Sequence, residues 1–224
     1  MEDLTIIYLT ASNLPDKFAN YVRGVLKEAI GDTRLISVSR EPLDFGYNLI
    51  DNGEKSTSNI YSQMLRAAKI AETAYIAIAE DDTLYHKNHF EFYRPELDTF
   101  GYNQNRFALF AWDSKMFSWR NRKSNCTLIA PRLLLIEALE ERFAKYPDGT
   151  PEHKTGELGR DRIEKRLGLT LRKSEERFSE ISVIQINHEG ASEQRQNTKR
   201  KRHGQIKVYD LYYWRKPKDI LSNL

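Results

Sequence analysis

The sequence predicts an α/β protein whose central, mostly parallel sheet is flanked by helices. The first observation is the order of its opening, where predicted strands at 4–9 and 34–39 enclose an amphipathic segment. A strand, a helix and a strand in this order favour a parallel pair joined by a right-handed crossover. The second observation is a short apolar run at 75–79 that ends in three consecutive carboxylates. Open α/β sheets bind their ligands at the carboxyl ends of strands, so this run predicts both a buried strand and a site.

Length and composition indicate one folded domain spanning residues 1–224. A chain of 224 residues that is 40% hydrophobic and 30% charged is typical of a soluble globular protein. No apolar stretch approaches the roughly 18 to 20 residues of a membrane span, and the acidic start Met1-Glu2-Asp3 does not resemble a signal peptide. Cys126 is the only cysteine. An internal disulfide is therefore excluded, and we expect a cytoplasmic protein without a membrane partner.

Polar residues follow the first strand, Leu4 to Leu9, and precede the first helix. Asn13 is the expected helix cap, with Pro15 in the first turn and Gly31 after the last turn. One apolar face runs through the helix: Phe18, Tyr21, Val22, Val25, Leu26, Ala29 and Ile30. This spacing predicts a helix packed on one face of the sheet.

The ends of the first two strands are predicted to lie side by side, because parallel neighbours end at the same sheet edge. The second strand, Arg34 to Ser39, is followed by more polar residues. A nucleotide would bind at this edge, and the candidate ligands are Thr10, Ser12, Asn13, Arg40 and Glu41.

A second helix is predicted from about Ser58 to about Glu72, after a turn-rich stretch at 42–57. A helix N-terminus attracts phosphate oxygens, which makes Ser58 and Gln63 further candidates for nucleotide binding. Ordinary capping is the alternative role for Ser58.

The three carboxylates after the next strand are Glu80, Asp81 and Asp82. Adjacent acids raise one another's pKa unless a cation neutralises them. Carboxylate oxygens suit Mg²⁺ or Mn²⁺, which often share them with substrate phosphates. The alternative is an acidic turn after a core strand.

Further strands are predicted at 106–112, 125–130 and 181–186, and a helix from Pro131 to about Tyr146. Trp112 is the last residue of one of these predicted strands and can stack on a sugar or a base. Packing over the sheet is the alternative role for this side chain.

The element order and the motif Glu80-Asp81-Asp82 resemble the nucleotide-sugar glycosyltransferases of the GT-A fold, which is Rossmann-like. The segments 39–46 and 79–85, followed by His89-Phe90, resemble one branch of that superfamily. This branch contains the base J-associated glucosyltransferases and phage relatives that glycosylate hydroxymethylated pyrimidines in DNA. Over residues 4–190 the resemblance implies a metal-dependent enzyme with UDP-glucose or a related donor, located in the host cytoplasm if a phage encodes it.

Site roles follow from this resemblance. Asp82 is the expected direct metal ligand, while Glu80 and Asp81 would bind ribose or sugar hydroxyls or a metal-bound water. In GT-A enzymes a late histidine often completes the metal site, and His188, just past the strand at 181–186, fits that position. An inverting enzyme also needs a carboxylate that accepts the acceptor's proton. Glu157 fits this role.

Asp161 and Glu152 are rivals of Glu157 as the general base. The alternative for each of these acids is a surface carboxylate that caps the following helix.

A basic segment at 195–204 predicts polyanion binding. Its candidate contacts with nucleic acid are Arg195, Lys199, Arg200, Lys201 and Arg202. They would contact phosphates of double-stranded DNA, the donor diphosphate, or solvent alone. The aromatic segment at 205–224 is predicted to pack back on the domain.

Three classes of function therefore compete. They are a glycosyltransferase acting on a modified pyrimidine in DNA, one of the same fold acting on polysaccharide or protein, and a non-enzymatic nucleic-acid-binding module. The strand-end acids and His188 argue against the third class, and the basic segment favours the first over the second.

Overall fold

The computed structural model describes residues 1–188 and 206–224, and these residues form two sheets. The basic segment at 195–204, for which DNA contacts are predicted, lies outside the described residues. The larger sheet has seven strands in the spatial order β10 (Lys173–Arg177), β6 (Thr99–Asn103), β9 (Leu128–Pro131), β4 (Tyr75–Glu80), β1 (Leu4–Leu9), β2 (Arg34–Ser39) and β3 (Tyr47–Ile50). Only β9 runs antiparallel to its neighbours. The predicted α/β class, with a mostly parallel sheet, is confirmed.

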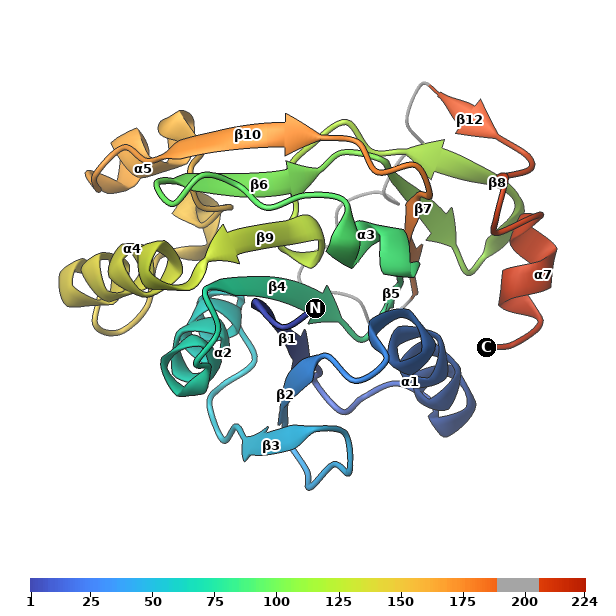
Figure 1. Cartoon of the computed structure of the whole chain (residues 1–224), viewed down its shortest axis with the longest axis horizontal. Coiled ribbons are helices and arrows are strands. Elements are labelled where there is room, and N and C mark those ends of the chain that lie inside the picture. Colours follow the sequence, from blue (N-terminus) through green and yellow to red (C-terminus); the bar gives the residue numbers. More distant parts are fainter. Residues whose placement is uncertain (189–205) are drawn as a thin grey trace.

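The smaller sheet has five strands in the order β12 (Lys207–Val208), β8 (Asp113–Trp119), β7 (Arg106–Phe110), β11 (Val183–Asn187) and β5 (Thr83–Leu84). Its one parallel pair is β7 with β11. The two sheets lie next to each other, the larger one crossing the left and centre of Figure 1 and the smaller one its right side.

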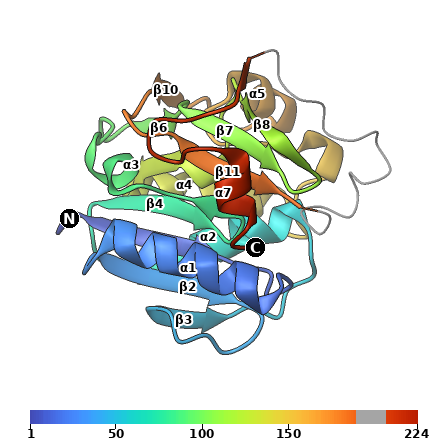
Figure 2. The same cartoon turned by 90° about the vertical axis from the view of Figure 1, so that its right-hand side faces the viewer.

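Helices cover both faces of the larger sheet. The helices are α1 (Asp16–Ile30), α2 (Thr57–Ile70), α3 (Lys87–Glu91), α4 (Arg132–Lys145), α5 (Asp161–Leu167) and α7 (Pro217–Leu221). Helices α2 and α4 bury one face, against Ile7 and Leu9, while α1 and α3 bury the other, against Ile6 and Tyr8. Figure 2 shows α1 along the larger sheet with α7 and the smaller sheet above it. Because β1 is buried along its whole length, its continuous apolar run matches a central strand of a parallel sheet.

The predicted boundary of the first helix is wrong at its start. Helix α1 begins at Asp16, the N-cap position is Pro15, and no side chain caps it. Asn13 lies two residues before that position and is exposed, so its side chain is not the cap. The end is as predicted: Gly31, at φ +55°, donates its N–H to the carbonyl of Lys27.

Other boundaries differ by a few residues. Ser56 caps α2 by accepting from the N–H of Asn59, so the helix starts before Ser58 and ends at Ile70. The strand expected at 106–112 ends at Phe110, and a 3₁₀ turn at Asn125–Thr127 precedes β9. The strand expected at 181–186 is β11.

The C-terminal segment packs on the domain through Trp214 and α7, whereas Tyr209, Tyr212 and Tyr213 are exposed. Trp214 is 8% exposed, and its indole N–H donates to the carbonyl of Ser182 at 2.6 Å. Ile220 of α7 is buried in the same cluster as Phe117 of β8. No helix within 1–188 or 206–224 has the length and apolarity needed to cross a bilayer.

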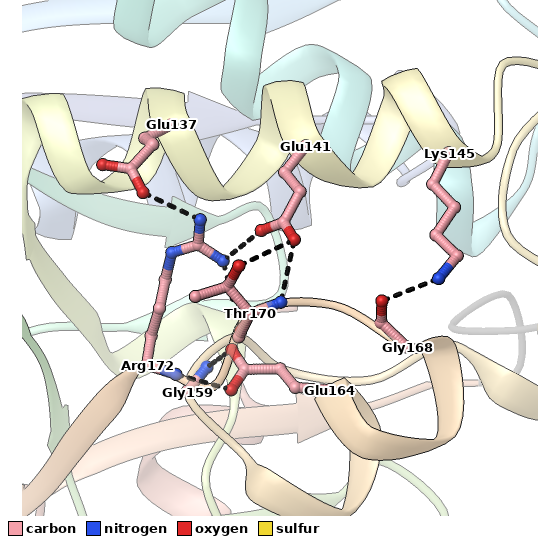
Figure 3. Close-up of polar contacts among 8 residues, drawn as sticks. All are labelled: Glu137, Glu141, Lys145, Gly159, Glu164, Gly168, Thr170 and Arg172. Carbon is pink, nitrogen blue, oxygen red and sulfur yellow. Dashed lines mark hydrogen bonds and ion pairs between the residues drawn. The ribbon is translucent and has the colours of Figure 1, made fainter.

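A cluster of charged side chains holds the loop between α5 and β10 against α4 (Figure 3). The side chain of Arg172 is 6% exposed and pairs with Glu137 at 2.9 Å and Glu141 at 2.6 Å. Glu141 also accepts from the N–H and the hydroxyl of Thr170. The buried Glu164 accepts from the backbone N–H of Arg172 at 2.9 Å. These bonds hold the edge strand β10 in place.

Candidate active site

The polar ends of β1, β2 and β4 are joined by hydrogen bonds. The Thr10 hydroxyl donates to Asp81 Oδ2 at 2.6 Å, and the Ala11 N–H reaches the same oxygen at 3.3 Å. The Ser12 N–H donates to Thr10 Oγ1 at 3.0 Å, and the Arg40 N–H donates to Ser12 Oγ at 3.2 Å. Four of the residues that the sequence singled out, Thr10, Ser12, Arg40 and Asp81, therefore meet at one sheet edge.

Ser12 adopts a left-handed backbone conformation with φ +53°. This conformation is uncommon for a residue other than glycine, and its cost of about 1 kcal/mol or more is often found at binding sites. The turn directs Ser12 Oγ to the β2 end and so connects the two strands.

The other predicted nucleotide ligands have different roles in the structure. Asn13 and Glu41 are exposed. Ser58 Oγ accepts from the N–H of Thr150 at 3.1 Å. Gln63 donates to Asp51 Oδ2 at 2.7 Å and is itself buried. These four side chains are not part of the hydrogen-bonded network around Asp81.

Asp51 is a buried acid at the end of β3 to which the sequence analysis assigned no role. Asn59 and Gln63 donate to its Oδ2, and Arg66 donates to its Oδ1 at 2.9 Å. Burial has the largest single effect and raises the pKa of Asp51, but hydrogen bonds from Gln63, Asn59 and the Gly53 backbone and the charge of Arg66 together leave the pKa lowered. Asp51 belongs to the stretch 42–57 that was predicted to be turn-rich. The pairing of its carboxylate with Arg66 depends on the contact between β3 and α2, which the sequence does not show.

The acidic turn, residues 80–82, connects β4 of the larger sheet to β5 of the smaller sheet. The N–H of Glu80, the last residue of β4, donates to Tyr85 Oη at 3.1 Å, and this hydroxyl donates to the carbonyl of Cys126 at 2.9 Å. Asp82 is 9% exposed, and its Oδ1 accepts from the Thr83 hydroxyl at 2.8 Å. The buried Tyr85, three residues after Asp82, thus fixes the shape of the turn.

Burial and charge repulsion raise the pKa of Asp81 to about 6. Burial contributes most and the charge of Asp82 second, while hydrogen bonds from Thr10 and Ala11 and the charge of His188 lower it. Burial and the charge of Asp81 also raise the pKa of the Tyr8 hydroxyl. Ionising Asp81 in this buried place beside Asp82 is therefore unfavourable, and a bound cation would lower the pKa of Asp81.

His188 lies close to the acidic turn although 106 residues separate it from Asp82 in sequence. Its charge acts on Asp81, and its ring packs edge-on against Phe18 at 5.7 Å between ring centres. Strand β11, which ends one residue earlier, pairs with β5, and the N–H of Ile186 donates to the carbonyl of Asp82 at 2.7 Å.

The residues present fit a Mg²⁺ or Mn²⁺ ion that is shared with a substrate. Among the described residues, no three or more His, Cys, Asp or Glu side chains gather with a geometry suited to a metal. Mg²⁺ typically takes one or two carboxylates from the protein and completes its shell with phosphate oxygens and water. Asp82 and His188 would hold the ion, and its charge would offset the repulsion between Asp81 and Asp82.

Glu157 lies in the loop before α5 and does not start that helix. Its Oε2 pairs with Arg160 at 2.5 Å, and its side chain is 20% exposed. The hydroxyl of Tyr102, at the carboxyl end of β6, donates to the carbonyl of Leu158 at 2.8 Å. Burial, then Tyr61, and then the charge of Glu157 raise the pKa of Tyr102. Glu157 thus lies near Tyr102 of β6, a strand that β9 separates from β4 in the larger sheet.

The rival acids lie elsewhere. Asp161 is the first residue of α5, and its side chain is 70% exposed beside Lys165 at 3.8 Å. It lines a cleft of about 810 Å³ next to β10, to which the acidic turn contributes no residue. Glu152 belongs to a 3₁₀ turn at Glu152–Lys154.

The structure is thus an α/β protein with acidic and polar side chains joined by hydrogen bonds at its strand ends. Comparison with family models and with curated proteins found no match. Among solved structures, the chain is similar to the bifunctional IspDF from Campylobacter jejuni, with 12% identity and a TM-score of 0.44 over 80% of this chain and 50% of that one. A nucleotidyl transferase from Methanothermobacter gives 13% identity and a TM-score of 0.46 over 79% and 88%.

A third similar structure is Staphylococcus aureus TarS 1-349 in complex with UDP-GlcNAc, with 10% identity and a TM-score of 0.43 over 85% of this chain and 60% of that one. The chain thus spans half the length of IspDF and 60% of the TarS fragment. These likenesses describe general architecture only.

Proposed function

We propose that the chain is a GT-A-like domain that transfers a sugar from a UDP-sugar to the hydroxyl of a modified pyrimidine in double-stranded DNA. The observation that carries the proposal is the meeting of Asp81 with Thr10, Ser12 and Arg40 at the ends of three parallel strands, with His188 beside them. This arrangement joins an acidic motif to polar strand ends at the edge where open α/β sheets bind nucleotides.

In an inverting transfer, the side chains of this site would have separate roles in binding the metal and the nucleotide-sugar donor. A Mn²⁺ or Mg²⁺ ion held by Asp82 and His188 would neutralise the charge that grows on the diphosphate leaving group. Thr10, Ser12 and Arg40 would bind the nucleotide, and Glu80 and Asp81 the hydroxyls of ribose or sugar.

Glu157 would act as the general base. The acceptor oxygen forms a bond to the anomeric carbon, the bond from that carbon to the diphosphate breaks, UDP leaves, and the acceptor's proton passes to Glu157. Its pairing with Arg160 orients the carboxylate.

The DNA acceptor is supported by the resemblance at 39–46 and 79–85 and by the basic segment at 195–204. Lysine and arginine contacts with phosphates supply affinity that does not depend on base sequence. A transferase acting on polysaccharide or protein remains the second candidate, because soluble enzymes of that kind can also be basic.

A transfer assay tests the proposal. The protein is incubated with Mn²⁺, a panel of radiolabelled nucleotide sugars, and one acceptor at a time: duplex DNA with 5-hydroxymethylated pyrimidines, the unmodified duplex, or a glycan mixture. We expect label from a UDP-sugar on the modified duplex alone, abolished by EDTA. Label on glycans would contradict the DNA acceptor. DNA binding without transfer or donor hydrolysis would contradict an enzyme.

A further inference from the structure

Three arginines of the smaller sheet and its loop lie close together. Arg106 begins β7, and its carbonyl accepts from the N–H of Arg120 at 2.9 Å. The guanidinium of Arg106 donates through Nη2 to the carbonyl of Arg122 at 3.2 Å. Burial, and then the charges of Arg122 and Arg106, lower the pKa of Arg120 to about 10. The three cations therefore repel one another across a short distance.

Arg106 is a buried cation whose hydrogen bonds go to neutral groups. It is 1% exposed, Nη1 donates to Gln185 Oε1 at 2.6 Å, and Nη2 donates to a backbone carbonyl. Its Nε has no hydrogen-bond partner, and no carboxylate of the described residues forms an ion pair with it. Removing a cation from water without an opposite charge is unfavourable. An anion bound above Arg106 would compensate this cost.

Aromatic rings lie beside the same cations. The guanidinium of Arg120 is 5.3 Å from the ring centre of Phe110, which is fully buried. The ring centre of Trp112 is also 5.3 Å from that of Phe110, and Trp112 is 44% exposed. A guanidinium and an open indole thus both contact one buried phenyl ring. Bases stack on such exposed aromatic rings with little regard to sequence.

This arginine–tryptophan patch, formed by Arg106, Phe110, Trp112, Arg120 and Arg122, lies next to the acidic turn. Strand β7 pairs with β11, and β11 pairs with β5, which begins one residue after the acids. Burial raises the pKa of the Cys126 thiol to about 12, and after burial the charge of Glu80 raises it while that of Arg106 lowers it. Cys126 thus lies within electrostatic reach of both the turn and the patch.

The patch also continues into the 810 Å³ cleft beside β10. Arg122 lines both. The cleft is mixed in charge, because its cations lie among four carboxylates, Glu96, Asp161, Glu175 and Glu176. Its Arg160 and Lys173 are paired with Glu157 and Asp98, so the phosphate contacts are assigned to Arg120 and Arg122 of the patch.

We propose that the arginine–tryptophan patch binds a nucleotide of a nucleic-acid acceptor strand, with its phosphate on Arg120 and Arg122 and its base on Trp112. The proposal rests on the proposed function in one respect, which is that the acceptor is nucleic acid. It assigns acceptor binding to described residues of the smaller sheet rather than to the basic segment at 195–204.

Direct binding tests the patch without requiring transfer. Affinity for a fluorescently labelled duplex with 5-hydroxymethylated pyrimidines is measured by anisotropy over a range of salt for wild type, Trp112→Ala and Arg122→Gln. The matched control is Arg34→Gln, an exposed arginine at the opposite, amino end of β2. UDP-glucose affinity is measured by calorimetry on the same proteins, and thermal melting confirms that each folds.

We expect Trp112→Ala to weaken DNA binding by about 5- to 100-fold, the range found for one base stacked on an aromatic ring. Arg122→Gln should reduce the slope of log affinity against log salt by about 0.9, the contribution of one phosphate contact. Arg34→Gln should leave the slope unchanged. Unchanged DNA binding in both patch variants overturns the proposal, and so does a loss confined to UDP-glucose affinity. A wild type that binds DNA through the patch and never binds a nucleotide sugar refutes the proposed function while leaving the patch in place.

Discussion

Replacing Asp81 by asparagine should make the metal-free protein more stable at neutral pH. The pKa of Asp81 is raised from 3.8 to about 6 by burial and by Asp82. Because the folded state disfavours the ionised form, stability from this group is fully present below pH 3.8 and is lost as the pH rises through about 6. The difference between these values, at about 1.36 kcal/mol per pH unit, gives about 3 kcal/mol. An asparagine side chain cannot ionise, and its amide oxygen can still accept from the Thr10 hydroxyl.

The measurement is urea denaturation of chelator-treated wild type and Asp81→Asn between about pH 4 and 8. The difference in the free energy of unfolding should shift in favour of the variant by about 3 kcal/mol over this range. Asp32→Asn, at an exposed turn, is the control. A difference between wild type and Asp81→Asn that stays constant with pH would refute the electrostatic description of the acidic turn.

Three further predictions concern the site and the scaffold. Asp82→Asn should keep the fold and abolish transfer, and normal turnover by this variant and by chelator-treated wild type would contradict metal dependence. Glu157→Gln should slow transfer by about 10²- to 10⁴-fold with donor affinity nearly intact, whereas His188→Ala should weaken donor binding itself. Equal losses of donor binding in both, measured by calorimetry, would exclude Glu157 as the base. Arg172→Ala should lower the free energy of unfolding by about 2–3 kcal/mol, because two charged hydrogen-bonded partners on α4 lose their donor. The control Lys173→Ala, whose ion pair is exposed, should lower the free energy of unfolding far less. Equal effects of the two substitutions in urea denaturation would contradict a stabilising role for the pairing of Arg172 with α4.

Local patterns predicted the central strands β1, β2 and β4 and the antiparallel β9 of the larger sheet. They did not predict β3, β6 or β10: residues 42–57 were expected to be turn-rich, and no strand was expected at 99–103 or 173–177. The prediction that the ends of β1 and β2 lie side by side matches the hydrogen bond from the Arg40 N–H to Ser12 Oγ. The contact between Thr10 and Asp81 depends on the pairing of β1 with β4, which was not predicted. The split into two sheets was not predictable in this way. Strand β5 has only two residues, and its pairing with β11 joins positions about 100 residues apart.

Side-chain roles were harder to predict than strands. Gln63 fits a phosphate site at a helix start, yet it holds the buried Asp51. Arg106 sits in an apolar strand, where a single charged residue gives no signal of whether it faces solvent or interior. Its burial depends on Gln185, contributed by a strand 79 residues later. Pairings of this kind are set by tertiary contacts and not by local sequence.

The acidic turn leaves one sheet at Glu80 and enters the other at Thr83. The binding of a ligand to residues 80–82 is therefore thermodynamically linked to the packing of the two sheets against each other, because that packing sets the positions of the three carboxylates. Linkage of this kind is reciprocal. A bound ligand should slow amide hydrogen exchange on both sides of the turn, and a substitution that loosens the contact between β5 and β11 should weaken ligand binding without touching any of the carboxylates.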